Sequence, residues 1–440
     1  MDTKRKIVGN TDGVDGLERL GGTRGDLPRP GSTNRALPKI LALSCSYPSP
    51  SQPCQGVFVQ RRLQHLAEVT EVRVVAPSAI VQYGNPKGQR IRVGVGHCPA
   101  VQCDAGIPVT RPRWFYPPFG GSLTAAWLFL QLLYPLARLR REFPFDVIDT
   151  HFGHPTGITG ALLSRVFGVP FTMTLRGNEP NHSRSALGRY CMSFALRNAI
   201  RVFTVSERLR QFAIGLGADA AKVKTVPNGV DAEIFFLRDS LTCRQKYGLS
   251  IDRPLVLSAG ALIERKGHHR IIQALKAIST ATNSPQLAIV GGPGPEGQYE
   301  QNLRQLVVAL DLSKTVRFLG VLNPEEMAEV MSAADVFCLA STNEGWPNVV
   351  HEALACGTPV IATDVGAVPD MLAAGKYGLV IPVNDPSALE NALATALQRG
   401  WNRSEISAWG RSRSWHQVAR EVLAEMQAIV ESDQTKGVRE

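Results

Sequence analysis

Runs of apolar residues alternate with amphipathic segments from Lys39 onward. Short apolar runs bounded by turn residues are typical of buried strands, whereas apolar residues repeated every three or four positions are typical of helices. The first series of predicted strands consists of Ile40–Ser44, Glu71–Ala76, Val147–Thr150, Phe171–Leu175 and Arg201–Val205. Strands separated by helices in this way predict a parallel sheet with helices on its faces.

A second series of strands begins near Arg253. It consists of Pro254–Ser258, Gln286–Val290, Val316–Leu319, Val336–Leu339, Pro359–Ala362 and Leu379–Ile381. We therefore expect an α/β protein with two Rossmann-like parallel sheets in tandem. Because ligands bind at the carboxyl ends of parallel strands, the cleft between the two sheets is the expected binding site.

The length of 440 residues exceeds what one hydrophobic core usually organises, so two domains are expected. Residues 1–36 lack hydrophobic periodicity and are predicted to be a flexible tail. We assign one Rossmann-like domain to residues 37–235 and the other to residues 236–405. Residues 406–440 are expected to form a helical segment that returns to the first domain.

Composition and cysteine spacing narrow the class of protein. With 44% hydrophobic and 20% charged residues, the chain has the composition of a globular protein. Its eight cysteines follow no signal peptide, which predicts a reduced, cytoplasmic protein. Cys98 and Cys103 do not have the spacing of a zinc site, so no metal is expected.

Positive charge is concentrated in the first half. Residues 37–235 contain 22 Lys and Arg against 11 Asp and Glu, a net charge of +11, whereas residues 236–440 contain 19 against 22, a net charge of −3. A basic half suits an anionic partner such as a membrane surface, although a solvated basic face explains it equally well. No nucleic acid is expected as a partner, because aromatic residues are only 7% of the chain and it contains no nucleic-acid-binding motif.

Two glutamates, Glu344 and Glu352, flank a predicted helix start after the strand Val336–Leu339. Pro347 suits the first turn of that helix, which leaves the backbone N–H groups of Asn348 and Val349 free to bind an anion. The two carboxylates could accept hydrogen bonds from sugar and ribose hydroxyls. Taken alone, two such glutamates are more often solvated helix charges.

Adjacent cations lie in the loop Gly260–Gly267, which follows the strand Pro254–Ser258. Arg265 and Lys266 in a loop over the cleft could neutralise a diphosphate through charge-assisted hydrogen bonds. An Arg–Lys pair on a protein surface usually has no binding role, so Arg265 and Lys266 indicate a binding site only in combination with the two glutamates.

In combination these segments resemble glycosyltransferase family 4. The resemblance runs from about Lys39 to Val430, and the segments that carry it are Tyr47–Phe58, Asp149–Phe152, Pro227–Asp231, Gly260–Gly267, Glu344–Glu352 and Gly366–Asp370. It implies the GT-B architecture, in which an acceptor-binding first domain faces a nucleotide-sugar-binding second domain. It also implies retaining transfer from a nucleoside diphosphate sugar, with no obligatory metal or other cofactor.

The resemblance gives roles to individual residues. It implies that Lys266 and Arg265 bind the diphosphate, that Glu344 touches the donor sugar, and that Glu352 binds the ribose. Gly56 would open the phosphate-facing loop. The other candidate substrate-binding residues are Asn228, Gly260, Trp346, Asn348 and Val349.

Two positions depart from the family pattern. Ala261 follows Gly260 where many members have arginine, so one phosphate contact is absent or comes from Arg265. Arg176 stands where many members have histidine, which puts a catalytic histidine there in doubt and makes Arg176 a candidate substrate-binding residue. His151 is the candidate catalytic histidine, and His154 is a further candidate, although a structural or positioning role is an open alternative for both.

Other enzyme classes fit the sequence less well. Gly292–Gly297 satisfies the dinucleotide-binding pattern G-x-G-x-x-G, but Asp311 comes before the next strand, where a ribose contact would be misplaced. The metal-dependent GT-A type is disfavoured because the chain contains no Asp-x-Asp. An epimerase is disfavoured by the Glu344–Glu352 segment. A catalytically weak GT-B-like protein that binds a nucleotide sugar or a membrane remains the alternative.

We therefore predict a hexosyltransferase of polysaccharide and cell-envelope biosynthesis that acts on a lipid-linked or polysaccharide-precursor glycan acceptor. The apolar run Leu123–Ala137 is too short to span a bilayer, which needs about 20 residues, and it is followed by Arg138, Arg140 and Arg141. An apolar anchor beside a basic end predicts peripheral attachment at the inner face of the membrane.

Overall fold

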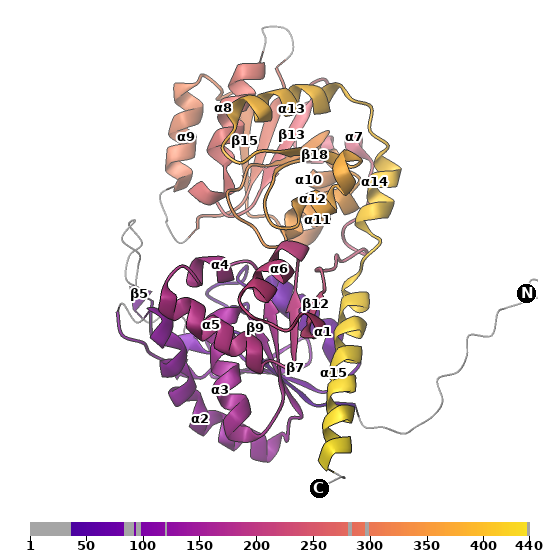
Figure 1. Ribbon diagram of the computed structural model, residues 1–440. Helices are drawn as coiled ribbons and strands as arrows, with labels where there is room; N and C mark the ends of the chain where they lie inside the picture. Colours follow the sequence, from indigo (N-terminus) through magenta and orange to yellow (C-terminus); the bar gives the residue numbers. More distant parts are fainter. Residues whose placement is uncertain are drawn as a thin grey trace, which may run out of the picture. The chain divides into compact units, whose positions relative to one another are not determined.

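The computed structural model describes residues 37–82, 92–93, 98–118, 121–279, 284–294 and 299–437. Residues 37–440 belong to one compact unit that contains two large sheets, one in each half of the chain (Figure 1). The predicted tail 1–36 lies outside the described residues, as does Gly297, the last glycine of the dinucleotide-like pattern.

The first sheet has eight strands in the order β12-β11-β10-β9-β1-β2-β7-β6. These strands are β1 (Ile40–Leu43), β2 (Val72–Val75), β6 (Val101–Asp104), β7 (Ile107–Thr110), β9 (Val147–His151), β10 (Phe171–Leu175), β11 (Arg201–Thr204) and β12 (Val223–Thr225). Every neighbouring pair is parallel except β6 and β7, which are antiparallel at one edge.

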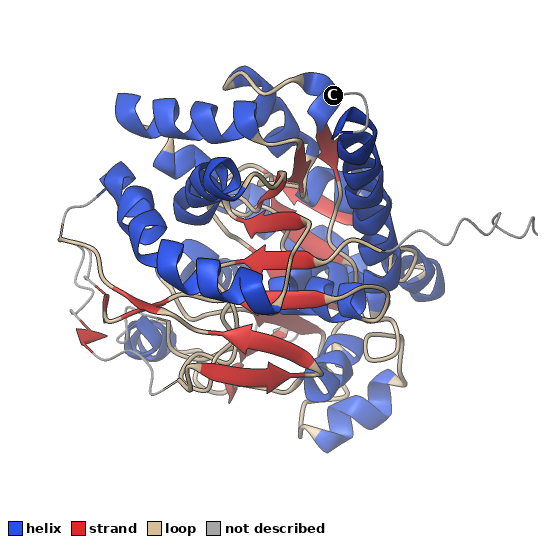
Figure 2. Ribbon diagram, turned by 90° about the horizontal axis from the view of Figure 1, so that it is seen from below, coloured by secondary structure: helices blue, strands red, loops and turns tan. Residues whose placement is uncertain are grey.

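Helices cover both faces of this sheet, as Figure 2 shows from below. Because side chains alternate along a strand, Leu41 and Leu43 point to one face while Ile40 and Ala42 point to the other. The first face packs against α2 (Thr124–Glu142), α3 (Ile158–Phe167), α5 (Ala186–Asn198) and α6 (Glu207–Gly215). The second face packs against α1 (Val57–Ala67) and α15 (Trp415–Gly437).

The second sheet is wholly parallel, with the order β15-β14-β13-β16-β17-β18. Its strands are β13 (Leu255–Ala259), β14 (Gln286–Val290), β15 (Val316–Gly320), β16 (Val336–Leu339), β17 (Val360–Thr363) and β18 (Gly378–Ile381). The order reverses between β13 and β16, which is the dinucleotide-fold arrangement with its ligand crevice at the reversal point.

Two groups of helices enclose the second sheet. One face is covered by α8 (His268–Ile278), α9 (Tyr299–Ala309) and α13 (Pro386–Gln398). The helices of the other side are α7 (Ser240–Lys246), α10 (Pro324–Ala333), α11 (Asn348–Ala355), α12 (Val368–Met371) and α14 (Arg403–Gly410). Each sheet therefore has a hydrophobic core on both faces.

The α/β class and the eleven strands predicted from apolar runs are confirmed, with bounds that differ by at most one residue at either end. The predicted parallel first sheet is confirmed, and it carries in addition one antiparallel strand at its edge, where the short segment Asp104–Ile107 lets β6 turn back on β7 as a hairpin. Pro347 caps α11 rather than lying in its first turn, so the helix begins at Asn348.

The chain crosses between the two halves twice, near Val230 and near Arg413, and the two crossing segments are hydrogen-bonded to each other. Val230 donates its backbone N–H to the carbonyl of Arg413 at 3.0 Å, and the Arg413 side chain returns a bond to the Pro227 carbonyl at 3.1 Å. After this second crossing α15 runs along α1, where Trp415, Val418 and Val422 enter the core of the first sheet (Figure 1).

We expect Gly229→Ala to weaken this crossing. A Cβ atom at Gly229 would lie 2.4 Å from Trp415 N and 2.7 Å from Ser414 O, and neither backbone atom can rotate away. The free energy of unfolding should fall by about 1–3 kcal/mol, seen as a lower Tm in thermal denaturation. Gly400→Ala, where a Cβ atom meets nothing within 4 Å, is the matched control and should leave the Tm unchanged.

Candidate functional site

A cavity of about 230 Å³ lies where loops from the two halves meet. The first half contributes Phe58, Phe152 and Arg176, and the second half contributes Glu344 and Trp346. The other lining residues are Ser46, Gly177, Asn178, Val205, Asn228, Arg265, Asn343 and Gly345. Because the loop with Glu344 follows β16, the cavity opens at the reversal point of the second sheet.

Lys266 and Arg265 both approach the Glu344 carboxylate. Lys266 Nζ lies 2.7 Å from Glu344 Oε1, and Arg265 Nη1 lies 3.4 Å from the same oxygen. Ser341 Oγ donates a third bond to it at 2.8 Å. The predicted diphosphate-binding cations and the predicted sugar-binding carboxylate thus form one cluster, in which Arg265 is the more exposed cation.

Glycine allows the backbone to approach closely around this cluster. Gly260 has a φ of 145°, and the aliphatic part of Lys266 packs over it. Gly177 and Gly345 touch across the two halves, since a Cβ atom at Gly177 would lie 2.7 Å from Gly345 Cα. A side chain at Gly177 or Gly345 would push the two loops apart, so the narrow cavity depends on these two glycines.

Arg176 lies at the centre of a buried polar chain between the halves. Its guanidinium donates to Asn228 Oδ1 at 2.7 Å and lies 3.0 Å from His151 Nδ1. Asn228 in turn donates to Asn348 Oδ1 at 3.0 Å, at the start of α11. Arg176 also lies over the ring of Phe58, with 5.2 Å between its Cζ atom and the ring centroid. Burial and the neighbouring Arg62 lower the pKa of Arg176 to about 9, so the guanidinium is still charged at neutral pH.

His151 lies behind Arg176 and does not line the cavity. Its ring is fully buried, and its Nε2 atom is 3.4 Å from Asp149 Oδ2. Burial lowers the pKa of His151 to about 4, although the Asp149 carboxylate opposes the shift. At neutral pH the imidazole is therefore uncharged, and its contact with Arg176 orients the guanidinium.

Glu179 is a site residue that the motif analysis did not single out. Its buried carboxylate accepts the backbone N–H groups of Gly153 at 3.1 Å, Arg176 at 3.0 Å and Gly177 at 2.7 Å. It therefore holds together the two loops that follow β9 and β10. The sequence offered one indication of this role: Glu179 lies three residues after Arg176, and a carboxylate at that spacing can accept backbone hydrogen bonds from the preceding turn.

The second glutamate, Glu352, has different surroundings from Glu344. It lies inside α11 and is partly buried, and no hydrogen bond to its carboxylate is found among the described residues. Burial raises the pKa of Glu352 to about 7, and Arg61 only partly opposes this. A carboxylate without partners in this position has its acceptor capacity available for a ligand.

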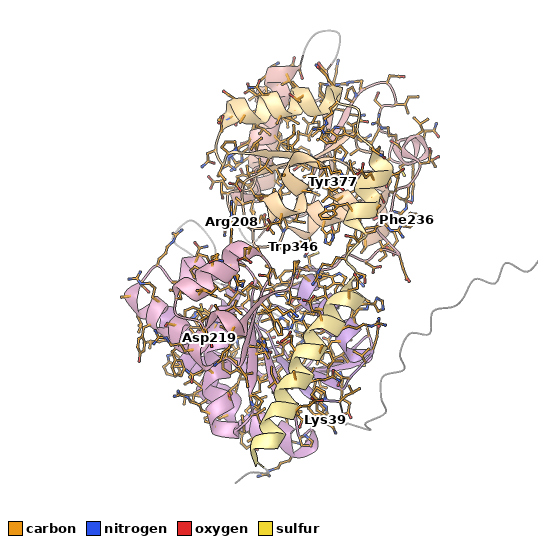
Figure 3. The ribbon with its side chains drawn as sticks, turned by 45° about the vertical axis from the view of Figure 1, so that its right-hand side comes forward. Lys39, Arg208, Asp219, Phe236, Trp346 and Tyr377 are labelled. Carbon is orange, nitrogen blue, oxygen red and sulfur yellow. The ribbon has the colours of Figure 1, made fainter. Side chains whose placement is uncertain are left out.

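The remaining predicted residues surround the same junction. Gly56 precedes α1 with a φ of 73°, and a Cβ atom there would lie 2.2 Å from the Ser46 carbonyl oxygen. Trp346 packs against the cores of both halves, as its position in Figure 3 indicates. Val349 lies in the first turn of α11 and is partly buried. Five of the predicted residues line the cavity: Arg176, Asn228, Arg265, Glu344 and Trp346. Lys266, Asn348 and His151 contact these residues, whereas Gly56, Gly260, Val349 and Glu352 are not among the described residues that line it.

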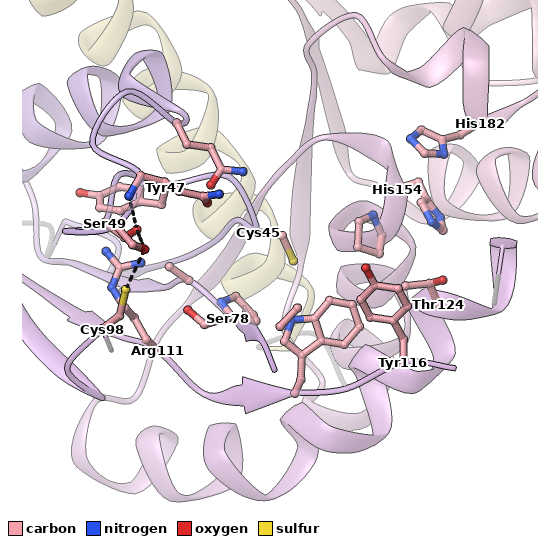
Figure 4. Close-up of a pocket in the computed structure, with 18 of the residues that line it drawn as sticks. Cys45, Tyr47, Ser49, Ser78, Cys98, Arg111, Tyr116, Thr124, His154 and His182 are labelled. Carbon is pink, nitrogen blue, oxygen red and sulfur yellow. Dashed lines mark hydrogen bonds between the residues drawn. The ribbon is translucent and has the colours of Figure 1, made fainter. Parts of the chain in front are cut away.

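A second cavity, of about 500 Å³, lies within the first half (Figure 4). His154 and His182 stack at one end with 4.6 Å between ring centroids, while Cys98 and Arg111 lie at the other. The hydrogen-bonding and aromatic residues between them include Tyr47, Ser49, Gln52, Ser78, Trp114, Tyr116 and Thr124. Among the described lining residues Arg111 alone carries a fixed charge, because burial and His182 lower the pKa of His154 to about 4.

Two family models match the chain. The model described as "Glycosyl transferases group 1" matches residues 239–413, and the model described as "Glycosyl transferase 4-like domain" matches residues 55–229. The first match contains the Lys266–Glu344 cluster and the second contains Arg176, so both sides of the cavity belong to matched segments.

Similar proteins include curated glycosyltransferases and a structure solved with a nucleotide sugar. TuaC of Bacillus subtilis (strain 168), whose name refers to teichuronic acid biosynthesis, is 29% identical over 374 residues, which are 82% of this chain and 88% of TuaC. A D-inositol 3-phosphate glycosyltransferase of Acidothermus cellulolyticus is 30% identical over 274 residues, 58% of this chain and 60% of that protein. The structure of Anabaena Alr3699/HepE in complex with UDP-glucose has a TM-score of 0.68 and 21% identity, covering 89% of this chain and 99% of that one.

We expect Arg176→Lys to lower turnover by about 10- to 100-fold, the equivalent of one lost charge-assisted hydrogen bond. A lysine cannot reach His151 and Asn228 together with the fixed geometry of a guanidinium. Because burial and Arg62 would also lower the pKa of a lysine at this position, the turnover of Arg176→Lys should fall further as the pH rises. Arg304→Lys, on the exposed face of α9, is the matched control. Restored activity in Arg176→His with a new limb near pH 6–7, about the imidazole range, would contradict this role.

Proposed function

This chain is a glycosyltransferase of family 4, and on that basis we propose that it moves a hexosyl unit from a nucleoside diphosphate sugar to a lipid-linked or polysaccharide-precursor acceptor with retention of the anomeric configuration. The observation that carries the proposal is the convergence of Lys266 and Arg265 on Glu344 beside Arg176. Three cations around one small cavity suit the charge of a diphosphate.

The binding mode of the donor follows from the two glutamates. A diphosphate that enters the cavity would draw Lys266 and Arg265 toward its oxygens and leave Glu344 free to accept hydrogen bonds from the sugar. Glu352, which carries no protein partner among the described residues, would accept the ribose hydroxyls. Alr3699/HepE, which shares the fold, was solved with UDP-glucose, and this supports a nucleotide sugar as donor.

The proposed catalysis is mainly electrostatic. As the bond to the anomeric carbon breaks, negative charge grows on the leaving diphosphate, and fixed cations in a water-poor cavity stabilise it. Retention follows from attack by the acceptor hydroxyl on the face that the diphosphate leaves. His151 acts in this scheme as a positioning residue, because it contacts Arg176 and does not line the cavity.

The larger cavity of the first half is the proposed acceptor site. Its aromatic rings offer flat apolar faces, and its hydroxyl and amide groups both donate and accept hydrogen bonds, which suits a sugar. No carboxylate is found among the described residues that line it, so a glycan that carries an acidic group meets no like charge there.

A membrane-facing surface of α2 and α5 is the proposed route to a lipid-linked acceptor. Along α2 the apolar side chains of Leu123, Trp127, Leu130 and Tyr134 recur on one face and are 37–80% exposed. Exposed arginines on the same two helices are Arg138, Arg141 and Arg189, and the exposed Arg184 lies just before α5. Apolar contacts flanked by cations fit the interface of an anionic bilayer. None of the helices in the described ranges is long and apolar enough to cross a membrane.

We expect three substitutions to fail in different ways. Lys266→Ala should lower kcat by about 10² or more, since Lys266 faces charge that grows in the transition state. Glu344→Gln should also lower kcat, because the carboxylate faces the developing positive anomeric centre. Glu352→Gln should mainly raise the donor KM, since the ribose does not change charge during transfer. Steady-state kinetics with the donor that gives the largest thermal shift in a nucleotide-sugar panel measures all three.

The pH dependence separates the glutamates further. In the unaltered enzyme the donor KM should fall as the pH rises through about 7, when Glu352 ionises, and Glu352→Gln should remove this dependence. Loss of turnover in Glu352→Gln with near-normal Glu344→Gln and Lys266→Ala would contradict the assignment. Donor binding without transfer to any acceptor and without donor hydrolysis would favour a nucleotide-sugar-binding module instead.

We expect vesicles rich in anionic lipid to carry more protein in a flotation assay than neutral vesicles at low salt. The double substitution Trp127→Ser with Leu130→Ser should reduce flotation, because it removes the apolar part of the surface. Val308→Ser, which removes a still more exposed apolar side chain from α9, should not. Equal flotation with both kinds of vesicle would contradict membrane binding through this surface.

A further inference from the structure

Two histidines and a glutamate meet where the end of α1 lies against the start of α15. His65 Nδ1 is 2.9 Å from Glu68 Oε1, and His416 Nε2 is 3.1 Å from Glu68 Oε2. The two imidazole rings face each other with 4.1 Å between centroids. One donor atom from each of the three residues lies within 4.8 Å of the others, so a single ion could touch all three.

The chemistry of these three groups selects the kind of ion. Two imidazole nitrogens and one carboxylate oxygen form a set that suits Zn²⁺, with bonds of about 2.0–2.2 Å. Ca²⁺ and Mg²⁺ prefer oxygen ligands throughout. Small outward movements of the side chains would open the space for the ion, and the half-exposed Glu68 and His416 can make them. Their exposure also leaves room for water as a fourth ligand.

We infer that His65, Glu68 and His416 bind a zinc ion that fastens α15 to α1. His65 and Glu68 are three residues apart on α1 and project from the same side of the helix. His416 comes from the far end of the chain, so the ion closes a contact between segments distant in sequence.

The position of the cluster gives the ion a structural role distinct from donor binding. His416 is the second residue of α15 and follows directly on the paired crossing of Val230 and Arg413. A bond from His416 to α1 therefore stiffens the connection through which the two halves are joined. The same helix α1 carries Arg62, whose guanidinium lies 3.2 Å from Asp149 behind the donor cavity.

An ordinary ion pair is the alternative, and it makes a different prediction. Exposed pairs contribute little to stability and do not respond to micromolar zinc. A bound ion stabilises the folded chain in proportion to the logarithm of its concentration above the dissociation constant. Metal dependence of the Tm is thus the property that separates the two.

The test uses the full chain, stripped of metal with a chelator, with Zn²⁺ as the added probe. We expect the Tm to rise by about 2 °C or more with excess Zn²⁺ at pH 7.5, and to rise much less at pH 5, where protons compete for imidazole. Co²⁺ in place of Zn²⁺ should give visible absorption bands of a four- or five-coordinate site. Both signals should disappear in His416→Arg, which places a cation beside Glu68 but cannot bind metal.

Two further variants complete the test. Glu68→Gln should weaken the zinc response, since an amide is a poor ligand, while Glu405→Gln removes a comparably exposed carboxylate from another ion pair and should leave the response intact. Because all of these variants keep the eight cysteines, binding to thiols would raise the Tm equally in each. An equal zinc response in the unaltered chain and in His416→Arg, or none in either, would overturn the inference.

Discussion

The buried carboxylate of Asp149 is the charge on which the site depends. It is fully buried and accepts a hydrogen bond from Thr172 at 2.7 Å, while Arg62 lies 3.2 Å away and His151 lies 3.4 Å away. Burial alone would raise its pKa, but Arg62 and His151 hold the pKa of Asp149 well below its usual range. An unpaired charge in such a place is strongly unfavourable, so Asp149 fixes Arg62 and, through His151, Arg176. The shape of the cavity between the two halves follows from these contacts.

The fold and part of the site could be predicted because the patterns that indicate them lie within short segments of the sequence. Strands such as β10 and β14 are continuous apolar runs, and Lys266 and Glu344 lie directly after such strands. The features that could not be predicted are contacts between segments that lie far apart in the sequence. The contact of Gly177 with Gly345 and the large cavity of Figure 4 arise from segments that have no common pattern in the sequence. His151 stands in a recognisable motif, yet only packing shows that it lies behind Arg176.

One motif contains two carboxylates with opposite electrostatic surroundings. Glu344 lies against two cations and a hydroxyl, whereas Glu352 has only the distant influence of Arg61. Environment, and not residue type, sets what each can do, as in other enzymes that use paired carboxylates. Glu344 is held in place by its protein partners before any ligand binds. The buried carboxyl group of Glu352 has no such partners, and hydroxyl groups of a ligand would supply the hydrogen bonds that it lacks.

The return of α15 to the first sheet has a consequence for how the protein is made. Ile40 and Ala42 face a core that is completed only by Trp415, Val418 and their neighbours, which leave the ribosome after both sheets have been synthesised. During translation domains usually fold in the order in which they emerge. Here the core of the first half is incomplete, with one apolar face uncovered, until α15 has been synthesised. The cores of the second half consist of residues between Val230 and Ile406, so they can form earlier. The first half is therefore synthesised first but completes its core last. Until then the apolar face of β1 and α1 is exposed, and it is the surface of the nascent chain that would need protection from aggregation.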